Sequence, residues 1–223
     1  PILFNLYVDN LIESLQNSGL GCYICTSFLG CIMYADDLIL LSPSIDGLQG
    51  MLNLCTVYGA NFDIMFNVKK TVCIVVGKHC CVNLPDMFLS NLVIPWSEQF
   101  KYLGIVFNAK CELEVDCSVI KRKFYASFNS IIYKCSAAAE PVKLHLIKSY
   151  CLPLLTYNIG ALELSKNVLS QLGICWNDAF HKIFGFHRWE SVKLVQYFCQ
   201  ELSFDYIYDL ARWQFLESFH RKI

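Results

Sequence analysis

The feature that most constrains this chain is a pair of adjacent carboxylates between two short apolar runs. Residues 31–34 (CIMY) and 38–41 (LILL) flank Ala35, Asp36 and Asp37. Short apolar runs around a polar break predict a β-hairpin with the acids at its tip. Aspartates are common in turns, so Asp-Asp alone favours a polar turn without chemistry. The alternative is a cation site, because like charges this close disfavour joint ionisation unless a cation or water screens them. Magnesium is then the expected ion, since it prefers oxygen ligands.

Composition excludes several other classes. The 223 residues are 55% hydrophobic and 17% charged, which is incompatible with an intrinsically disordered chain. The longest uncharged run, residues 14–35, is broken by polar residues and glycines, so it predicts a turn and strands and no membrane span. The chain opens at Pro1, without a basic and apolar leader. We therefore expect an intracellular fragment without a signal peptide.

The 13 cysteines are expected to be reduced and mostly packed as small hydrophobic residues. Cys22 and Cys25 form a C-x-x-C pair, and residues 79–81 read His-Cys-Cys. Neither cluster has a second ligand pair at the spacing of a zinc finger. A looser set matches no zinc pattern either: Cys175, His181, His187 and Cys199. A zinc site is therefore not expected.

Charge is distributed unevenly along the chain. The first 68 residues contain six acids and no Lys or Arg, whereas the remainder holds all 18 basic residues against 13 acids. An acidic region followed by a basic one fits a cation site beside a surface that binds a polyanion. The alternative is that the basic residues form an ordinary solvated helix face.

Periodicity predicts an α+β region up to about residue 110 and helices beyond it. We expect a helix over residues 1–18 that ends at Gly19, and a second helix that takes its N-cap from residues 42–44 and ends at Gly59. Strand candidates follow at residues 64–66, 71–76, 92–94 and 100–107. Later helices are expected over residues 115–135, from Pro141 with a break at Pro153, over 168–184, and in pieces over 192–219.

Several segments, in order, resemble the reverse transcriptases of non-LTR (LINE-type) retrotransposons. Residues 1–11 resemble the helix after the family's Gly-x-x-x-Ser-Pro motif, and residues 34–37 (YADD) match its active-site hairpin. Residues 66–71 (FNVKKT) and 100–104 (FKYLG) resemble the next two motifs, and residues 177–186 resemble a segment beyond the thumb. The resemblance implies a partial palm over residues 1–110, a helical thumb over 111–160 and a further helical region over 161–223.

The resemblance also implies a two-magnesium polymerase site for RNA-directed DNA synthesis. Asp36 would be the principal metal ligand, and Asp37 would assist it. Tyr34 and Ala35 would lie near the incoming deoxynucleoside triphosphate and the primer end. Lys70 is the candidate for the cation that helps pyrophosphate leave, with a solvated lysine as the alternative.

Two further groups of residues are implied to bind the nucleic acid. The primer-grip residues would be Phe100, Lys101, Tyr102, Leu103 and Gly104, although Phe100 and Leu103 also suit an ordinary core strand. On the thumb, Lys121, Arg122 and Lys123 would contact phosphates of an RNA template and a DNA primer. We predict that the later aromatic residues pack between helices and do not stack on bases: Trp176, Phe180, Phe184, Trp189 and Trp213.

One departure from the family concerns activity. Family members need another aspartate from an earlier strand, which would precede Pro1 together with the fingers and any endonuclease region. We therefore predict that the chain is a polymerase by family that does not polymerise alone. The family resemblance implies a nuclear location. Three alternatives stay open at this point: a relative in the same family that copies RNA from RNA, an inactive remnant that only binds nucleic acid or serves as a scaffold, and an apolar interaction module.

Overall fold

The computed structural model describes residues 2–77, 84–109 and 111–221. The chain forms two compact units. The first unit comprises Pro1–Tyr102 and Ala109–Glu112, and the helical unit comprises Leu103–Asn108 and Leu113–Ile223. The observed combination of helices and small antiparallel sheets confirms the predicted α+β class.

Two helices and the sheet residues packed on them form the core of the first unit. Helix α1 (Ile2–Asn17) buries Leu11 and Leu15, and α2 (Ile45–Phe62) buries Met51 on the same core. Each such side chain contributes about 1.5–3 kcal/mol when fully buried. The Tyr58 hydroxyl of α2 donates a hydrogen bond to the Tyr7 carbonyl of α1 at 2.8 Å, which fixes the two helices against each other.

The predicted start of α2 is confirmed, but its predicted end is wrong. The Ser44 hydroxyl accepts a hydrogen bond from the Gly47 amide, as an N-cap does. The helix continues through Gly59 and is capped by Asp63 at φ +53°. Gly59 serves close packing, because a Cβ there would lie 2.6 Å from the Ile64 carbonyl oxygen. The chain after the helix folds back onto Gly59, and this close approach is possible because glycine has no side chain.

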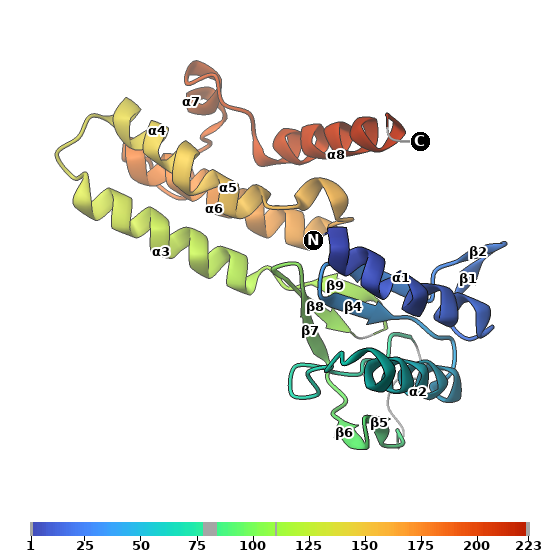
Figure 1. The fold of residues 1–223 in the computed structure, drawn as a ribbon. Helices are drawn as coiled ribbons and strands as arrows, with labels where there is room; N and C mark the ends of the chain where they lie inside the picture. Colours follow the sequence, from blue (N-terminus) through green and yellow to red (C-terminus); the bar gives the residue numbers. More distant parts are fainter. Residues whose placement is uncertain (1, 78–83, 110, 222–223) are drawn as a thin grey trace. The chain divides into compact units, whose positions relative to one another are not determined.

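Among the described residues, short strands pair in four small sheets. Figure 1 draws the strands as arrows. Strand β1 (Tyr23–Ile24) pairs with β2 (Ser27–Phe28), and β3 (Cys31–Tyr34) pairs with β4 (Asp37–Leu40), both antiparallel. The antiparallel hairpin of β5 (Met87–Leu89) and β6 (Leu92–Ile94) lies beside α2. There the Gln49 amide pairs with the backbone of Phe88, donating at 2.9 Å and accepting at 2.8 Å. The last sheet has the order β7 (Gln99–Tyr102), β8 (Ile105–Ala109) and β9 (Leu113–Val115).

Three of the strand predictions need correction. Residues 64–66 are not a strand, because the Ile64 amide turns back to the Gly59 carbonyl. Within 71–76, only Cys73 bridges to Trp96, and Pro95 lacks the amide that would extend this ladder. Residues 100–107 form two strands, since Leu103 and Gly104 adopt φ +46° and +84° and make a turn. The prediction for residues 92–94 is confirmed as β6, and β1 and β2 fall within the strands predicted for residues 14–35, whereas β5 and β9 were not predicted.

The first helix of the helical unit, α3 (Ser118–Lys134), begins later than predicted. Val115 belongs to β9, because Asp116 accepts hydrogen bonds from the Ser118 amide at 2.8 Å and the Ser118 hydroxyl at 3.0 Å. This local pairing starts the helix at Ser118. Pro141 lies in the first turn of α4 (Glu140–Tyr150), and the predicted break near Pro153 separates it from α5 (Leu152–Thr156).

The remaining helices complete one core. They are η1 (Ile159–Ala161), α6 (Lys166–Phe184), α7 (Lys193–Phe198) and α8 (Phe204–His220). Helices α3 and α4 pack along α6, which buries Trp176 and Phe180 at the centre, and α5 packs against α3 and α4 (Figure 1). Gly160 lets η1 approach α8, because a Cβ there would lie 2.5 Å from the Ala211 carbonyl oxygen. The predicted boundary between thumb and C-terminal region at residue 160 stays a prediction. Among the described helices, none has the length and apolar content to cross a bilayer.

Candidate functional site

The β3–β4 hairpin positions the adjacent carboxylates. Tyr34 pairs with Asp37 as the last rung of the ladder, and Ala35 and Asp36 form the turn. Ala35 has φ +51°, a left-handed conformation that costs a residue with a side chain on the order of 1 kcal/mol. Only Asp36 therefore lies at the tip, whereas the sequence analysis placed both acids there. Asp37 already belongs to the ladder of β4.

Both carboxylates are exposed and uncompensated. Within the described ranges, neither Asp36 nor Asp37 forms a hydrogen bond or an ion pair through its side chain. Oxygen ligands of this kind suit hard divalent cations, and Mg²⁺ is commonly held by one or two carboxylates plus substrate phosphates. No cluster of three or more Cys, His, Asp or Glu side chains suited to a metal occurs in the described residues. The pair can therefore supply part of a coordination shell and needs further oxygen ligands from a substrate or another segment.

Tyr102 lies within electrostatic reach of this hairpin, inside the first unit. Burial raises the pKa of the Tyr102 phenol, and the nearby charge of Asp37 and the phenol of Tyr34 raise it further. A negative neighbour disfavours a second negative charge, so Tyr102 stays a protonated donor beside Asp37. The fold thus brings together Tyr34, Asp37 and Tyr102, which are 68 or fewer positions apart in sequence but belong to three strands.

The predicted primer-grip segment is divided at its turn. Phe100 and Tyr102 are half-buried on β7 and Lys101 between them is exposed. Leu103 and Gly104 belong to the helical unit, where the Tyr157 hydroxyl donates to the Leu103 carbonyl at 3.2 Å. Sequence reasoning missed Tyr157, because nothing in its local pattern links it to a residue 54 positions earlier.

The predicted Lys70 lies in a tight turn. The amides of Lys70 and Thr71 and the Thr71 hydroxyl all donate to the Asn67 carbonyl, at 2.9–3.1 Å. This turn exposes the Lys70 and Lys69 side chains to solvent. Neither lysine forms an ion pair with Asp36 or Asp37 among the described residues. The turn therefore presents two free cations at neighbouring positions.

The predicted phosphate-binding residues on α3 are not equivalent. The Lys121 ammonium donates to the Gln171 side-chain oxygen of α6 at 2.6 Å and is half-buried. Arg122 and Lys123 are exposed. Successive helix positions differ by about 100°, so one helix face cannot present all three side chains. Arg122 and Lys123 are the residues of this group that solvent can reach freely.

The aromatic residues of the helical unit fall into two classes. Trp176 and Phe180 are fully buried and Phe184 is half-buried, which confirms their predicted packing role. The same prediction is wrong for Trp189, which is 81% exposed, and for Trp213, which is 69% exposed. Neither ring is covered by another helix of the described chain.

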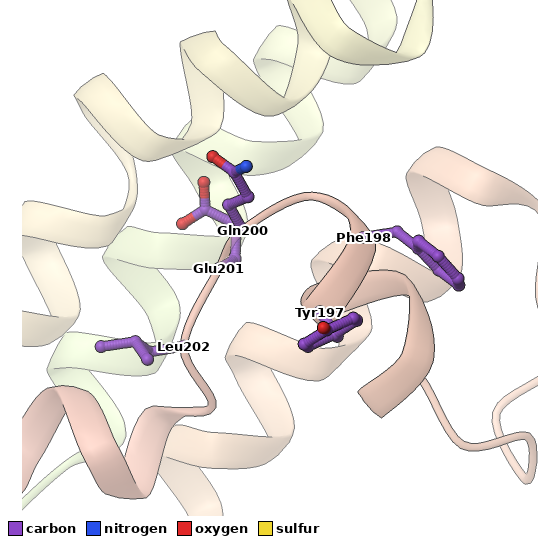
Figure 2. A pocket seen from close by; sticks show the side chains of 5 residues that line it. All are labelled: Tyr197, Phe198, Gln200, Glu201 and Leu202. Atoms are coloured by element: carbon purple, nitrogen blue, oxygen red, sulfur yellow. The ribbon is translucent and has the colours of Figure 1, made fainter.

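The helical unit also carries a surface hollow of about 540 Å³ after α7. It is lined by Tyr197, Phe198, Gln200, Glu201 and Leu202, and Figure 2 shows the Phe198 ring pointing away from the others. The Glu201 carboxylate is paired with Lys148 at 2.5 Å. This hollow therefore lacks a free charge of its own. The His-Cys-Cys cluster at residues 79–81 lies outside the described residues.

The model of the family described as reverse transcriptase (RNA-dependent DNA polymerase) matches residues 1–107, which include the hairpin and β7. Residues 1–107 belong to the reverse transcriptase family. Two relatives extend the likeness. The chain is 31% identical over 119 residues to the retrovirus-related Pol polyprotein of the type-2 retrotransposable element R2DM from Drosophila melanogaster. It is 30% identical over 174 residues to that of the type-1 retrotransposable element R2 from Popillia japonica.

These matches confirm the resemblance to reverse transcriptases of non-LTR retrotransposons. They cover 49% and 71% of this chain, but only 11% and 23% of the two relatives. The chain thus spans less than a quarter of the length of each relative. The family implies a divalent cation, and the two exposed carboxylates of the hairpin fit one as oxygen donors.

Proposed function

We propose that this chain supplies the metal-holding hairpin, the nucleotide-facing residues and the helical thumb of an RNA-directed DNA polymerase from a non-LTR retrotransposon. Its substrates are an RNA template, a DNA primer and deoxynucleoside triphosphates. The observation that carries the proposal is the exposed, unpaired Asp36 and Asp37 on a strained hairpin inside the region that matches the reverse transcriptase family. Neither carboxylate forms an ion pair among the described residues, so no side-chain cation of the described chain competes with a bound metal ion for them.

Mg²⁺ is the proposed ion, held through Asp36 with Asp37 beside it. When bound, a divalent cation at such a site lowers the pKa of an attacking hydroxyl and neutralises phosphate charge. Asp36, at the tip of the turn, faces solvent and has no competing partner in the described chain, so it is the principal ligand. The strand pairing of Asp37 with Tyr34 fixes the position of Asp37, and so it orients the Asp37 carboxylate as the second ligand.

The neighbouring side chains have supporting roles. Tyr34 and Ala35 face the incoming nucleotide, and Tyr102 keeps its proton beside Asp37 and so remains a hydrogen-bond donor. Lys70, free on its turn, is the proposed donor of charge or a proton to the leaving pyrophosphate. Arg122 and Lys123 bind phosphates of the template and primer without reading their sequence. A third carboxylate comes from outside these 223 residues, because the described part holds no group of three metal-binding side chains around the pair.

The first experiment measures cation binding directly. Titration of the 223-residue chain with Mn²⁺, followed by electron paramagnetic resonance, should reveal one or more sites, and Mg²⁺ should displace the Mn²⁺. Asp36→Asn should abolish the tightest site. Asp86→Asn is the matched control, because Asp86 is another exposed acid of the first unit. Unchanged Mn²⁺ binding in Asp36→Asn contradicts the proposal and leaves a nucleic-acid-binding remnant as the remaining function.

The second experiment measures nucleotide joining. A polypeptide that extends the chain to include the further carboxylate should elongate a DNA primer on an RNA template with Mg²⁺, and Asp36→Ala should abolish that synthesis. The 223-residue chain by itself should show no elongation. Elongation by the isolated chain that is lost in Asp36→Ala would support the polymerase but contradict the need for a third carboxylate.

A further inference from the structure

A short turn between α6 and α7 displays a tryptophan to solvent. Trp189 is 81% exposed, although the His187 ring already stacks on it with centroids 4.5 Å apart and planes 4° apart. One face of the indole is therefore backed by an imidazole and the rest is open. Isolated apolar residues are common on surfaces, but a tryptophan of this exposure with a stacked neighbour forms a flat platform.

The turn that carries this platform is held by its own hydrogen bonds. The His187 amide donates to the Glu190 carboxylate at 2.5 Å, and the Glu190 amide donates to the His187 carbonyl at 3.0 Å. From α6, the His181 Nε2 atom lies 2.9 Å from the Glu190 carbonyl oxygen, to which it donates. Three hydrogen bonds thus fix four residues. The platform is ordered before any ligand arrives, which lowers the entropic cost of binding.

Asp178 ties the same turn to the core of the helical unit. Its carboxylate accepts a hydrogen bond from the Tyr125 hydroxyl of α3 at 2.7 Å and another from Arg188 at 3.3 Å. The Asp178 side chain is 13% exposed, whereas the Arg188 side chain is 82% exposed. Arg188 is therefore anchored at one nitrogen and keeps most of its guanidinium available to solvent beside Trp189.

The charges around the platform favour a polyanion. From residue 182 to residue 193 the chain carries Lys182, Arg188 and Lys193 against one acid, and that acid, Glu190, is engaged by the His187 amide. Tyr197 lies one turn after Lys193 on α7 and leads to the hollow of Figure 2. Cations beside an exposed ring match the phosphate and the base of a single-stranded nucleic acid. Bases inside a duplex are already stacked and have no free face to offer.

We propose that the turn of residues 187–190 binds an unpaired base of single-stranded RNA by stacking on Trp189, with adjacent phosphates at Arg188 and Lys193. The choice of RNA rests on the proposed function, because in RNA-directed DNA synthesis the RNA template is single-stranded until it is copied. The site lies in the helical unit and is separate from the Asp36 hairpin of the first unit.

The test measures the affinity of the 223-residue chain for a fluorescent 15-nucleotide RNA without secondary structure, by anisotropy. Trp189→Ala should weaken binding about tenfold, since stacking on an aromatic side chain is worth roughly 5- to 150-fold per base. Trp189→Phe should recover most of that affinity. Trp213→Ala is the matched control, because Trp213 is similarly exposed on α8 but has no stacked ring beside it in the described chain. It should leave the affinity unchanged.

Salt dependence separates the two kinds of contact. Trp189→Ala should leave the slope of log affinity against log salt unchanged, whereas Arg188→Gln should reduce it by about 0.7, the contribution of one phosphate on a single strand. A blunt RNA–DNA duplex should bind Trp189→Ala and the parent chain equally well. DNA of the same sequence is tested alongside, and a loss confined to DNA overturns the assignment to RNA.

Three results would overturn the proposal. The first is an RNA affinity unchanged in Trp189→Ala, and the second is an equal loss in Trp213→Ala. The third is self-association of the chain, seen by sedimentation, that Trp189→Ala abolishes, which would make the turn a protein contact. The two functions fail separately: Asp36→Asn should keep full RNA affinity, and Trp189→Ala should keep Mn²⁺ binding.

Discussion

The two units use their carboxylates in opposite ways. In the first unit, Asp36 and Asp37 are exposed and have no hydrogen-bond or ion-pair partner among the described residues. In the helical unit, Asp178 is largely buried and accepts hydrogen bonds from Tyr125 and Arg188. A paired, buried carboxylate stabilises the fold that surrounds it, whereas an unpaired, exposed pair contributes repulsion until a cation arrives. The comparison therefore separates an acid that holds the structure from two acids that have no side-chain partner in the described chain.

The largest effect should come from the core of the helical unit. Trp176→Ala removes a fully buried indole that also donates to the Leu202 carbonyl at 3.0 Å, so it should lower the free energy of unfolding by about 3–5 kcal/mol. Trp213→Ala, at an exposed position of the same unit, should change it by less than about 0.5 kcal/mol. Urea unfolding followed by circular dichroism measures both variants. Similar losses in the two variants would mean that burial does not distinguish these tryptophans.

High pH should act alike on one buried thiol of each unit. Burial raises the pKa of Cys151 in the helical unit and of Cys73 in the first unit, each from 9.0 to about 11. Below pH 9 the folded and unfolded states both hold the thiol proton, so stability is complete there. As pH rises from 9 to 11 only the unfolded state releases its proton, and the free energy of unfolding falls by about 2–3 kcal/mol per thiol.

Alanine variants isolate this contribution. Urea unfolding at pH 8 and pH 11 gives the loss for the parent chain, and the loss should shrink in Cys151→Ala and in Cys73→Ala. If the fall in the free energy of unfolding between pH 8 and pH 11 is smaller in only one variant, the two buried thiols do not contribute equally.

The central comparison is tested by removing one acid from each unit. Asp178→Ala leaves the half-buried Tyr125 hydroxyl without its acceptor and frees Arg188, so it should destabilise the chain by about 2 kcal/mol. Asp36→Ala should change the free energy of unfolding by less than about 0.5 kcal/mol, because no partner in the described chain is lost. Asp178→Asn, which keeps an acceptor oxygen, should recover part of the loss. A destabilisation by Asp36→Ala as large as that by Asp178→Ala would contradict the distinction.

The smallest effect should be equal in the two units. Ser44 caps α2 by accepting from the Gly47 amide at 3.1 Å, and Ser165 caps α6 by accepting from the Val168 amide at 3.3 Å. Ser44→Ala and Ser165→Ala should each cost about 1 kcal/mol in urea unfolding. Equal costs would show that helix starts are built alike in both units. A negligible cost for one variant would mean that tertiary packing, and not the cap hydrogen bond, determines where that helix starts.

Local chemistry made much of the fold predictable. The N-cap at Ser44, Pro141 in the first turn of α4 and the break at Pro153 depend on a few neighbouring residues, and all three were predicted. The β3–β4 hairpin was predicted from two apolar runs around a polar break. Gly59 shows where local reasoning failed. Glycine is typical of helix ends, but Gly59 lies inside α2, where the absence of a side chain lets the returning chain at Ile64 approach closely.

In the candidate site too, some features follow from local sequence and others depend on segments that are distant in the chain. The YADD motif, together with the order of the other segments, predicts Asp36 and Asp37 as metal ligands, and this assignment stays a prediction. The proximity of Tyr102 to Asp37 and the hydrogen bond from Tyr157 to Leu103 depend on segments distant in sequence. The two tryptophans show the limit most clearly. Helical spacing assigns Trp176 and Trp213 to faces of their helices, but it does not say which face another helix covers.

By itself the sequence determined the types of most helices, the acidic hairpin and the family, because these depend on residue identity and short-range spacing. Only the tertiary structure decided which charged and aromatic side chains have partners. It left Asp36 and Trp189 open to solvent, enclosed Trp176, and joined Asp178 to Tyr125 across 53 positions. The reason is physical: burial and pairing are properties of surfaces that meet in space, and those surfaces come from segments far apart in the chain.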